Sequence, residues 1–356
     1  MANIGTRAPS LLTACNHHDN ENSGFTLYNI SNKLHLEFDH TFLHEKLFIG
    51  SQYGWLTVLD LHCEPTLFNP LTGESISLPS ITTLPRVRPN HSVSGDIVSY
   101  FFRTTYRPES LFEDCAFEDC LIEVTFKKVL ISSNPSTFSS KFFAAALVGF
   151  NSKLVVSRPG ESRWNLLREE ERYMDIMFCQ DGKLICLTDK RAILEVEFKD
   201  DNFVITEMVA PFVKDNTDFN MYLAEDCAGR VLIIIRRYNF TTMPETNDVK
   251  VFRLIGCSRK ENKWESVKSL DGQAIFVGTN APISLSKQDV CGDIKEDTIY
   301  FTDEWWGYMV GDEERRSPRD ICAYNLISNS IEPCCPYDHK QCTWPLPVWV
   351  HLLNPK

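Results

Sequence analysis

Four residues near the end of the sequence have side chains of the types that bind zinc: Cys334, Cys335, His339 and Cys342. Structural zinc sites usually place two Cys ligands in a Cys-x-x-Cys knuckle, because that spacing lets both thiolates reach one ion. Here Cys334 and Cys335 are adjacent, and the surrounding segment is rich in Pro. We therefore expect free thiols in this segment, no metal site and no cofactor.

Motifs for catalysis are missing from the sequence. It contains no Gly-rich phosphate loop of the Walker type, no nucleophile elbow and no His-Glu-x-x-His. Adjacent acids such as Asp200 and Asp201 precede Asn202, a composition typical of a hairpin turn rather than of an acid–base pair. We therefore predict no catalytic residues and a protein that is not an enzyme.

Residues 303–319 form a long charged stretch that also holds Trp305, Trp306 and Tyr308. Loops of this length in a folded domain are usually functional or disordered. Trp and Tyr are enriched among the residues that dominate binding at protein interfaces, where charged residues form the rim. The three aromatic residues are therefore candidates for partner binding. The alternative is that Trp305 and Trp306 fold back and pack on the domain itself.

Residues 83–128 form a second irregular stretch, which begins basic and turns acidic. Arg103, Tyr106 and Arg107 lie in its basic part and are the other candidates for partner binding, through contacts with an acidic surface. Because isolated exposed charges contribute little energy, a solvated surface segment is the alternative interpretation.

Composition restricts what such segments can bind. The 356 residues are 43% hydrophobic and 24% charged, which provides enough apolar material for a sizeable core. The net charge of −12 repels phosphate groups, so we expect neither a nucleic acid nor a membrane as the partner. The expected partner is a protein, whose identity the sequence does not give.

The sequence also predicts the compartment. It contains no apolar run of the length that spans a bilayer, and residues 1–20 lack the pattern of a secretory signal. The 13 Cys are therefore expected to be reduced thiols in the cytoplasm or the nucleus.

Short runs rich in β-branched and aromatic residues, separated by turn residues, predict an all-β fold. The best helix candidate, residues 164–175, is the exception to this pattern. Three successive groups of four strands can be distinguished: residues 173–208, 220–269 and 274–332. Units of four strands at a period of about 40–50 residues indicate a β-propeller, and a β-sandwich is the less suitable alternative.

Counting blades backward from these groups adds one at about residues 46–78 and one at about 142–168. Strands at 25–30, 33–38 and 348–353 remain, and we expect them to form a further blade in which both ends of the chain close the ring. Six blades are favoured and seven stay open. The expected organisation is a flexible segment at 1–20 and one propeller domain at 21–356, with long insertions at about 83–128 and 303–319.

Several segments, in this order and at this spacing, resemble a known family. They are Gly50-Ser-Gln-Tyr-Gly-Trp55, Phe68-Asn-Pro-Leu-Thr-Gly73, Ser157-Arg-Pro-Gly160, Tyr222-Leu-Ala-Glu225, Leu270-Asp-Gly-Gln-Ala-Ile-Phe-Val-Gly278 and Trp344-Pro-Leu-Pro-Val-Trp349. The chain from about Pro9 onward is similar to the plant F-box-associated β-propeller family of the KIB type. No single segment is specific, but together they make the resemblance strong.

The resemblance implies a non-enzymatic propeller that recognises a target protein. In such relatives an upstream F-box docks on the adaptor of a cullin–RING ubiquitin ligase, so the propeller acts as a substrate receptor. No helical F-box pattern precedes Pro9-Ser-Leu-Leu12 in this sequence, so direct binding to the ligase adaptor is not expected. Two alternatives stay open: a metal-dependent hydrolase or lactonase on a six-bladed propeller, and a degenerate member of the family without a partner.

Overall fold

The computed structural model shows a chain built almost entirely of strands and turns. It describes residues 8–15, 24–38, 40–44, 46–103, 113–116, 126–137, 142–149, 151–199, 202–209, 219–240, 244–256, 262–302, 320–334 and 346–352. Within these ranges the helical structure consists of two short 3-10 turns, η1 (Thr41–Leu43) and η2 (Ile81–Thr83). The prediction of an all-β protein is confirmed.

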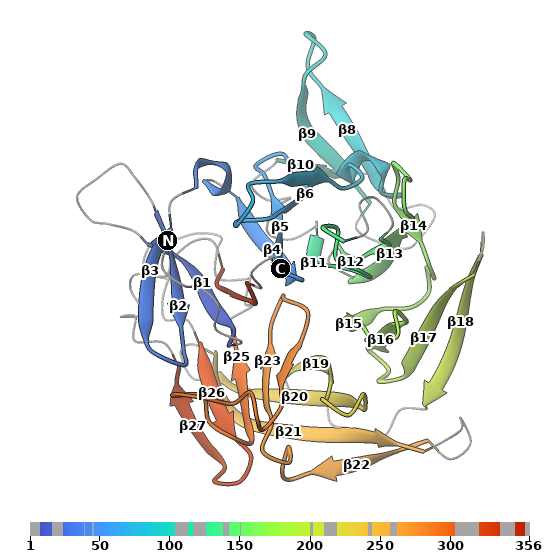
Figure 1. Cartoon of the computed structure of the whole chain (residues 1–356). Coiled ribbons are helices and arrows are strands. Elements are labelled where there is room, and N and C mark those ends of the chain that lie inside the picture. The colour runs from blue at the N-terminus through green and yellow to red at the C-terminus, as the bar shows by residue number, and fades with distance from the viewer. Residues whose placement is uncertain are drawn as a thin grey trace.

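Sheets of four or five strands stand side by side around a common centre, and one three-stranded sheet lies at the outside (Figure 1). The first sheets contain β28 (Val348–Val350), β1 (Ser10–Cys15), β2 (Gly24–Asn29) and β3 (Leu34–Phe38); β4 (Leu47–Gln52), β5 (Trp55–Leu59), β6 (Pro65–Phe68) and β7 (Ser75–Ser77); and β8 (Val87–His91), β9 (Ile97–Phe102) and β10 (Glu113–Cys115).

The remaining sheets follow in chain order. They contain β11 (Phe126–Ile131), β12 (Ala144–Val148), β13 (Lys153–Ser157) and β14 (Asn165–Leu166); β15 (Tyr173–Phe178), β16 (Leu184–Thr188), β17 (Ile193–Lys199) and β18 (Asn202–Val209); β19 (Phe219–Glu225), β20 (Val231–Phe240), β21 (Pro244–Ile255) and β22 (Lys263–Val267); and β23 (Ala274–Val277), β24 (Ile283–Leu285), β25 (Thr298–Phe301), β26 (Cys322–Asn325) and β27 (Ser330–Pro333).

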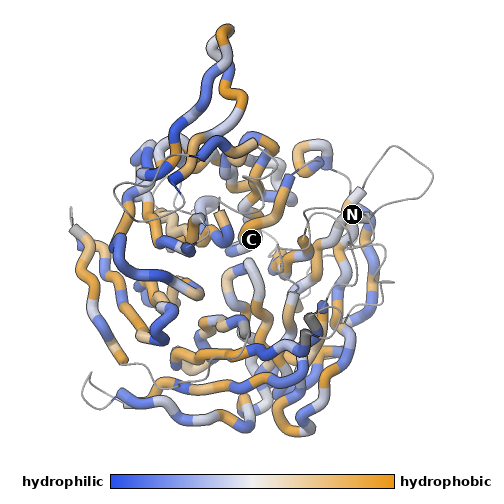
Figure 2. Tube along the Cα trace, turned by 180° about the vertical axis from the view of Figure 1, so that it is seen from behind, coloured by the Kyte–Doolittle hydropathy of each residue, from blue (hydrophilic) through white to orange (hydrophobic). Residues whose placement is uncertain are grey.

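Burial explains why the strands near the middle of each sheet read as continuous apolar runs. Every residue of β12, β13 and β16 is buried, because each of these sheets has a neighbouring sheet on both faces. In the outer strand β22, by contrast, three of the five residues are exposed. Figure 2 shows the result along the chain, with hydrophobic stretches in the strands and hydrophilic residues at many of the turns.

The strand groups expected from the sequence correspond to sheets of the structure. Residues 173–208 form β15–β18, and residues 220–269 form β19–β22. The third group gains the unexpected strand β24, which pairs antiparallel with β23, while β23 itself runs parallel to β25. The helix expected at 164–175 is wrong: this segment contains β14 and the start of β15, and Trp164 is buried between sheets rather than on a helix face.

Both ends of the described chain belong to one sheet of order β28-β1-β2-β3. Strands at 25–30, 33–38 and 348–353 were expected to share a blade, but the structure inserts β1 between β28 and β2. β1 lies within the segment 1–20 that we expected to precede the domain. Its Leu11 and Leu12 are fully buried, so these residues are part of the core.

The stretch at 83–128 carries the three-stranded sheet of order β10-β9-β8. Its β8–β9 hairpin projects from the rest of the molecule (Figure 1), with Val93 fully exposed in the turn. At the base of the hairpin, Val87, Tyr100 and Phe102 are buried against the neighbouring sheets, which anchors the projection.

Candidate functional site

Of the six residues selected from the sequence as candidates for partner binding, Arg103 is the one that lies among the described residues. Trp305, Trp306, Tyr308, Tyr106 and Arg107 lie outside the described residues. Arg103 follows β9 directly and is partly buried, and its backbone N–H donates to the Arg86 carbonyl at 3.3 Å.

Of the four candidate zinc ligands, the structure describes Cys334. Cys334 is partly buried, whereas Cys335, His339 and Cys342 lie outside the described residues. Elsewhere, within the residues the structure describes, no three His, Cys, Asp or Glu side chains are grouped closely enough to hold a metal ion.

A buried arginine holds the two residues that flank the 303–319 stretch. The Arg236 side chain of β20 is 0% exposed, and its Nη1 donates to the Thr302 carbonyl at 2.8 Å. Its Nη2 donates to the Asp320 carbonyl at 2.6 Å and forms an ion pair with the Asp320 carboxylate at 2.9 Å. Arg236 therefore fixes both ends of the insertion to the sheet formed by β19–β22.

Neighbouring residues also accept a hydrogen bond from Nε of Arg236 and stabilise its positive charge. Arg236 Nε donates to Thr246 Oγ1 at 2.7 Å, and the Thr246 N–H and hydroxyl donate to the Asp320 carboxylate at 2.7 and 2.6 Å. The guanidinium also lies over the rings of Tyr238 and Phe301, a favourable position for a cation. This Arg236 cluster is a structural anchor for the insertion.

The turn between β23 and β24, residues 278–282, reaches the common centre of the sheets (Figure 1). Its Ala281 N–H donates to the Ser51 carbonyl at 2.9 Å, and its Gly278 carbonyl accepts a hydrogen bond from Lys128 Nζ at 3.3 Å. Ser51 and Lys128 belong to two other sheets, so this turn connects sheets across the centre.

A buried ion pair lies beside this turn. Lys128 Nζ and Asp175 Oδ1 are 2.7 Å apart, and their side chains are 7% and 5% exposed. The Asp175 carboxylate also accepts the Leu223 N–H at 2.7 Å and the Ile176 N–H at 2.8 Å. Burial raises the pKa of the Asp175 carboxyl, and the Lys128 ammonium and the two N–H groups oppose that shift. The pair thus joins β11, β15 and β19.

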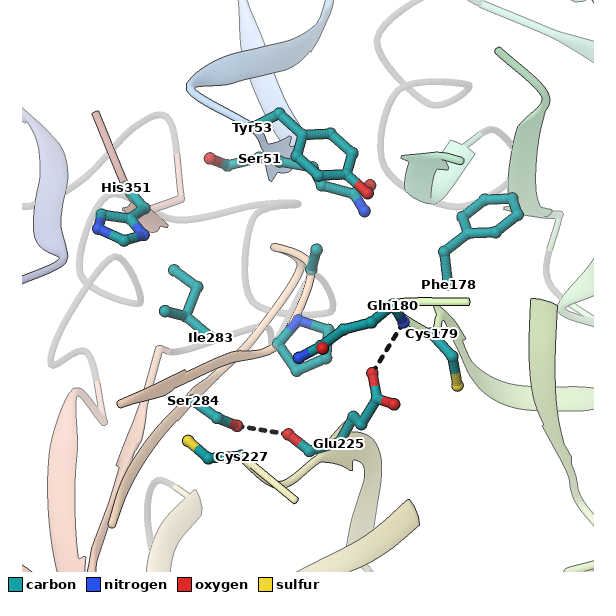
Figure 3. A pocket seen from close by; sticks show the side chains of 13 residues that line it. Ser51, Tyr53, Phe178, Cys179, Gln180, Glu225, Cys227, Ile283, Ser284 and His351 are labelled. Atoms are coloured by element: carbon teal, nitrogen blue, oxygen red, sulfur yellow. Dashed lines mark hydrogen bonds between the residues drawn. The ribbon is translucent and has the colours of Figure 1, made fainter. Parts of the chain in front are cut away.

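A cavity of about 260 Å³ opens next to the 278–282 turn (Figure 3). It is lined by the turns that follow β4, β15 and β19, by the start of β24 and by His351 after β28. Close packing of β4 on β11 places the first of these turns: a Cβ at Gly50 would stand 2.3 Å from the Val129 carbonyl oxygen, so only Gly fits there. At the end of β4, the Gln52 side chain accepts the Ile131 N–H at 2.9 Å.

Glu225 is the acidic residue of this pocket. Its Oε2 accepts the Gln180 N–H at 3.0 Å, and its backbone carbonyl accepts the Ser284 hydroxyl at 2.6 Å (Figure 3). Burial raises the pKa of the Glu225 carboxyl, the Gln180 N–H opposes the shift, and Asp181 and Asp226 add to it. In the described structure no Lys or Arg forms an ion pair with this carboxylate.

The two thiols of the pocket are poor nucleophiles. Burial raises the pKa of Cys179 to about 12, with a further increase from the Glu225 carboxylate. Burial also raises the pKa of Cys227. Because the thiolate is the reactive form of cysteine, both side chains remain protonated at neutral pH. The arrangement of the described residues is suited to holding a ligand rather than to attacking one.

Sheets arranged around a common centre, with their turns surrounding a cavity, are the architecture of a β-propeller. Residues 27–325 match the family described as the KIB1-4 beta-propeller, and the chain belongs to this family. The resemblance found in the sequence is confirmed.

Curated relatives of the chain are F-box proteins of Arabidopsis thaliana. The putative F-box protein At5g60060 is 26% identical over 56% of this chain and 52% of its own length. The F-box protein SKIP23 is 21% identical over 86% of this chain and 76% of its own length. This chain thus spans about half the length of the first relative.

A solved structure, the Cps50 (Swd1) beta-propeller domain of Myceliophteria thermophila, is similar at 10% identity, covering 87% of this chain and 89% of that chain with a TM-score of 0.35. Within the described residues, no helix combines the length and the hydropathy needed to cross a membrane.

The pocket, the Lys128–Asp175 pair and Arg236 were not expected from the sequence. The sequence does carry a signal for the three charged residues. Lys128, Asp175 and Arg236 each lie within an apolar strand; Arg236, for example, follows Val-Leu-Ile-Ile-Ile. The pocket has a different signal. Two segments that carry the family resemblance, at 50–55 and 222–225, supply Ser51, Gln52, Tyr53 and Glu225 to its lining.

Proposed function

We propose that this protein is a non-enzymatic recognition module that holds a partner protein on its propeller, as a substrate receptor linked to ubiquitination. Membership of the KIB1-4 beta-propeller family carries this proposal, together with relatives that are F-box proteins. We place the protein in the cytoplasm or the nucleus, where these relatives are expected to act.

The chemistry of the centre supports recognition over hydrolysis. A hydrolytic propeller needs carboxylates at the centre that are available to a metal or to water. The buried carboxylate found there, Asp175, already accepts hydrogen bonds from Lys128, Leu223 and Ile176. The two thiols of the pocket, Cys179 and Cys227, have raised pKa values, which disfavours nucleophilic catalysis.

We further propose that the propeller is a six-bladed ring closed by the pairing of β28 with β1. The register Ser10↔Val350 to Leu12↔Val348 supports this closure, and Trp349 is fully buried in it. In a closed ring, we expect the backbone amides of β1 and β28 to exchange with solvent as slowly as those of β2. Hydrogen exchange measured by mass spectrometry tests this, and fast exchange confined to β28 would contradict closure.

The 303–319 stretch is the proposed partner-binding segment, with Trp305, Trp306 and Tyr308 as anchors and Arg103, Tyr106 and Arg107 as further candidates. We expect the double variant Trp305→Ala and Trp306→Ala to weaken partner binding by at least about 2 kcal/mol, the usual threshold for binding hot spots. The melting temperature should change little. Affinity capture from plant extract, followed by titration of the captured partner, measures this effect.

The stability of the same variant separates the two interpretations of these tryptophans. If both rings packed on the propeller, their truncation would cost about 3–5 kcal/mol of stability, as for other large core side chains. A chain in which 303–319 is replaced by Gly and Ser provides a second comparison. Unchanged capture by both variants would reject this segment as the binding site.

A further inference from the structure

The pocket beside the 278–282 turn has an unbalanced negative charge. Among the described residues that line it, Glu225 is the acidic one and neither Lys nor Arg is present. The neighbouring Asp226 already has two cations, Arg230 at 2.7 Å and Arg253 at 3.5 Å. Within the described structure, the Gln180 N–H is the one group that donates to the Glu225 carboxylate, and partial burial weakens the hydration of this carboxylate.

Apolar and aromatic side chains form part of the wall of this pocket. Phe178, Pro282 and Ile283 line it together with the ring of Tyr53, which is 38% exposed at the rim (Figure 3). A basic side chain combines an apolar stem with a cationic head, and the stems of Lys and Arg are commonly buried against apolar surface. Aromatic faces at the rim favour a cation further.

We propose that this pocket binds a Lys or Arg side chain of the partner protein, with its cationic head paired to the Glu225 carboxylate. This inference rests on the proposed function, because the side chain belongs to the recognised protein. The stem would contact Phe178, Pro282 and Tyr53. The side chain of a partner fits better than a metal ion, because the described residues offer no group of three metal ligands.

The first test uses small probes, so it does not depend on knowing the partner. Nα-acetyl-lysine methylamide and Nα-acetyl-arginine methylamide are titrated into the full chain and followed by NMR or calorimetry. The uncharged control is Nα-acetyl-norleucine methylamide, which keeps the stem and lacks the cation. We expect at least one basic probe to bind about tenfold more tightly than the control, as for a charge-assisted hydrogen bond. Equal binding of all three probes, or no binding, would overturn the proposal.

The second test changes the protein. Glu225→Gln keeps the shape of the side chain and an acceptor for the Gln180 N–H, but removes the charge. We expect this variant to bind the basic probes about tenfold more weakly and to bind the norleucine probe with unchanged affinity. Glu265→Gln, on the exposed face of β22, makes the same charge change away from the pocket and should have no effect. Unchanged binding to Glu225→Gln would contradict the assignment.

The pH dependence of probe binding is a third measurement that needs no variant. Charged and titratable groups near Glu225 are Cys179 and Asp181 after β15, Asp226 and Cys227 next to it, and His351 across the pocket. Binding is lost as the pH falls and Glu225 takes up a proton, and the raised pKa moves this loss above the range of an exposed Glu. Comparison with Glu225→Gln isolates the contribution of the carboxyl. A pH profile that is the same in both proteins would count against Glu225.

The identified partner then separates this inference from the proposed function. If wild-type chain captures a partner and Glu225→Gln captures it equally well, the recognition function stands and the pocket inference fails. If the basic probes bind in the expected way but no partner protein binds the chain, the charge preference of the pocket stands, and the proposed function and its partner side chain fail.

Discussion

Replacing Lys128 by Met is expected to lower the free energy of unfolding by about 3–5 kcal/mol, the usual cost of breaking a buried ion pair. Lys128 and Asp175 are both almost fully buried, so the variant leaves a carboxylate without its cation at the centre of the protein. Met has a similar length and fills the same space. Chemical denaturation of the variant and the wild type measures the difference.

A double variant tests the origin of this loss. Lys128→Met combined with Asp175→Asn removes both charges, while the Asn side chain can still accept the Leu223 N–H. Replacing both members of a buried ion pair by uncharged groups often changes the stability little. We therefore expect the double variant to recover at least about half of the stability lost in Lys128→Met. A double variant as unstable as the sum of both single variants would show that packing, not charge, is responsible.

The stability of Lys128→Met should also depend more strongly on pH than the stability of the wild type. Burial raises the pKa of Asp175, and Lys128 opposes that shift; without the ammonium the pKa rises further, so the folded variant keeps a proton that the unfolded chain has already released. Stability then decreases as the pH rises through the folded-state pKa. We therefore expect the loss in Lys128→Met to be larger at about pH 8 than at about pH 5.

Replacing Arg236 by Met is expected to cost at least about 3 kcal/mol, because the variant removes several buried hydrogen bonds and leaves Asp320 without its cation. Arg236→Lys should be intermediate, since an ammonium keeps the charge but not the planar fork that reaches two carbonyls and Thr246. Thermal or chemical denaturation measures both variants.

The adjacent Arg237 provides the control for this prediction. Its side chain is partly exposed, and its ion pair with Asp248 has a distance of 3.8 Å. Such pairs contribute little, so Arg237→Met should cost less than about 1 kcal/mol. Similar losses for Arg236→Met and Arg237→Met would contradict an anchoring role for the Arg236 cluster.

The all-β fold and most of the strand groups could be predicted because each strand carries its own pattern. The segments at 173–208 alternate or read as apolar runs between turns that contain Gly or adjacent Asp. β24 could not be predicted in the same way. It is three residues long, and its strand state depends on pairing with β23 across a turn that reaches the centre.

β1 was missed for a related reason. Its short sequence, Ser-Leu-Leu-Thr-Ala-Cys, lacks clear alternation, and one of its two partners in the sheet, β28, lies more than 300 residues later in the chain. The pocket was missed because turns from separate sheets build it, so spacing in the sequence carries no information about it. Glu225 becomes distinctive only when its surroundings are known to lack a cation.

The position of the 278–282 turn has a consequence for the order of folding. This turn contacts Ser51 and Lys128, which precede it by more than 140 residues. During synthesis, the sheets from β4 to β22 emerge before the segment that fills the space between them. We therefore expect a nascent chain to pass through a stage in which the Lys128–Asp175 pair faces an open, hydrated centre. Contacts of such long range are slow to form, and exposed strands in this stage are targets for chaperones.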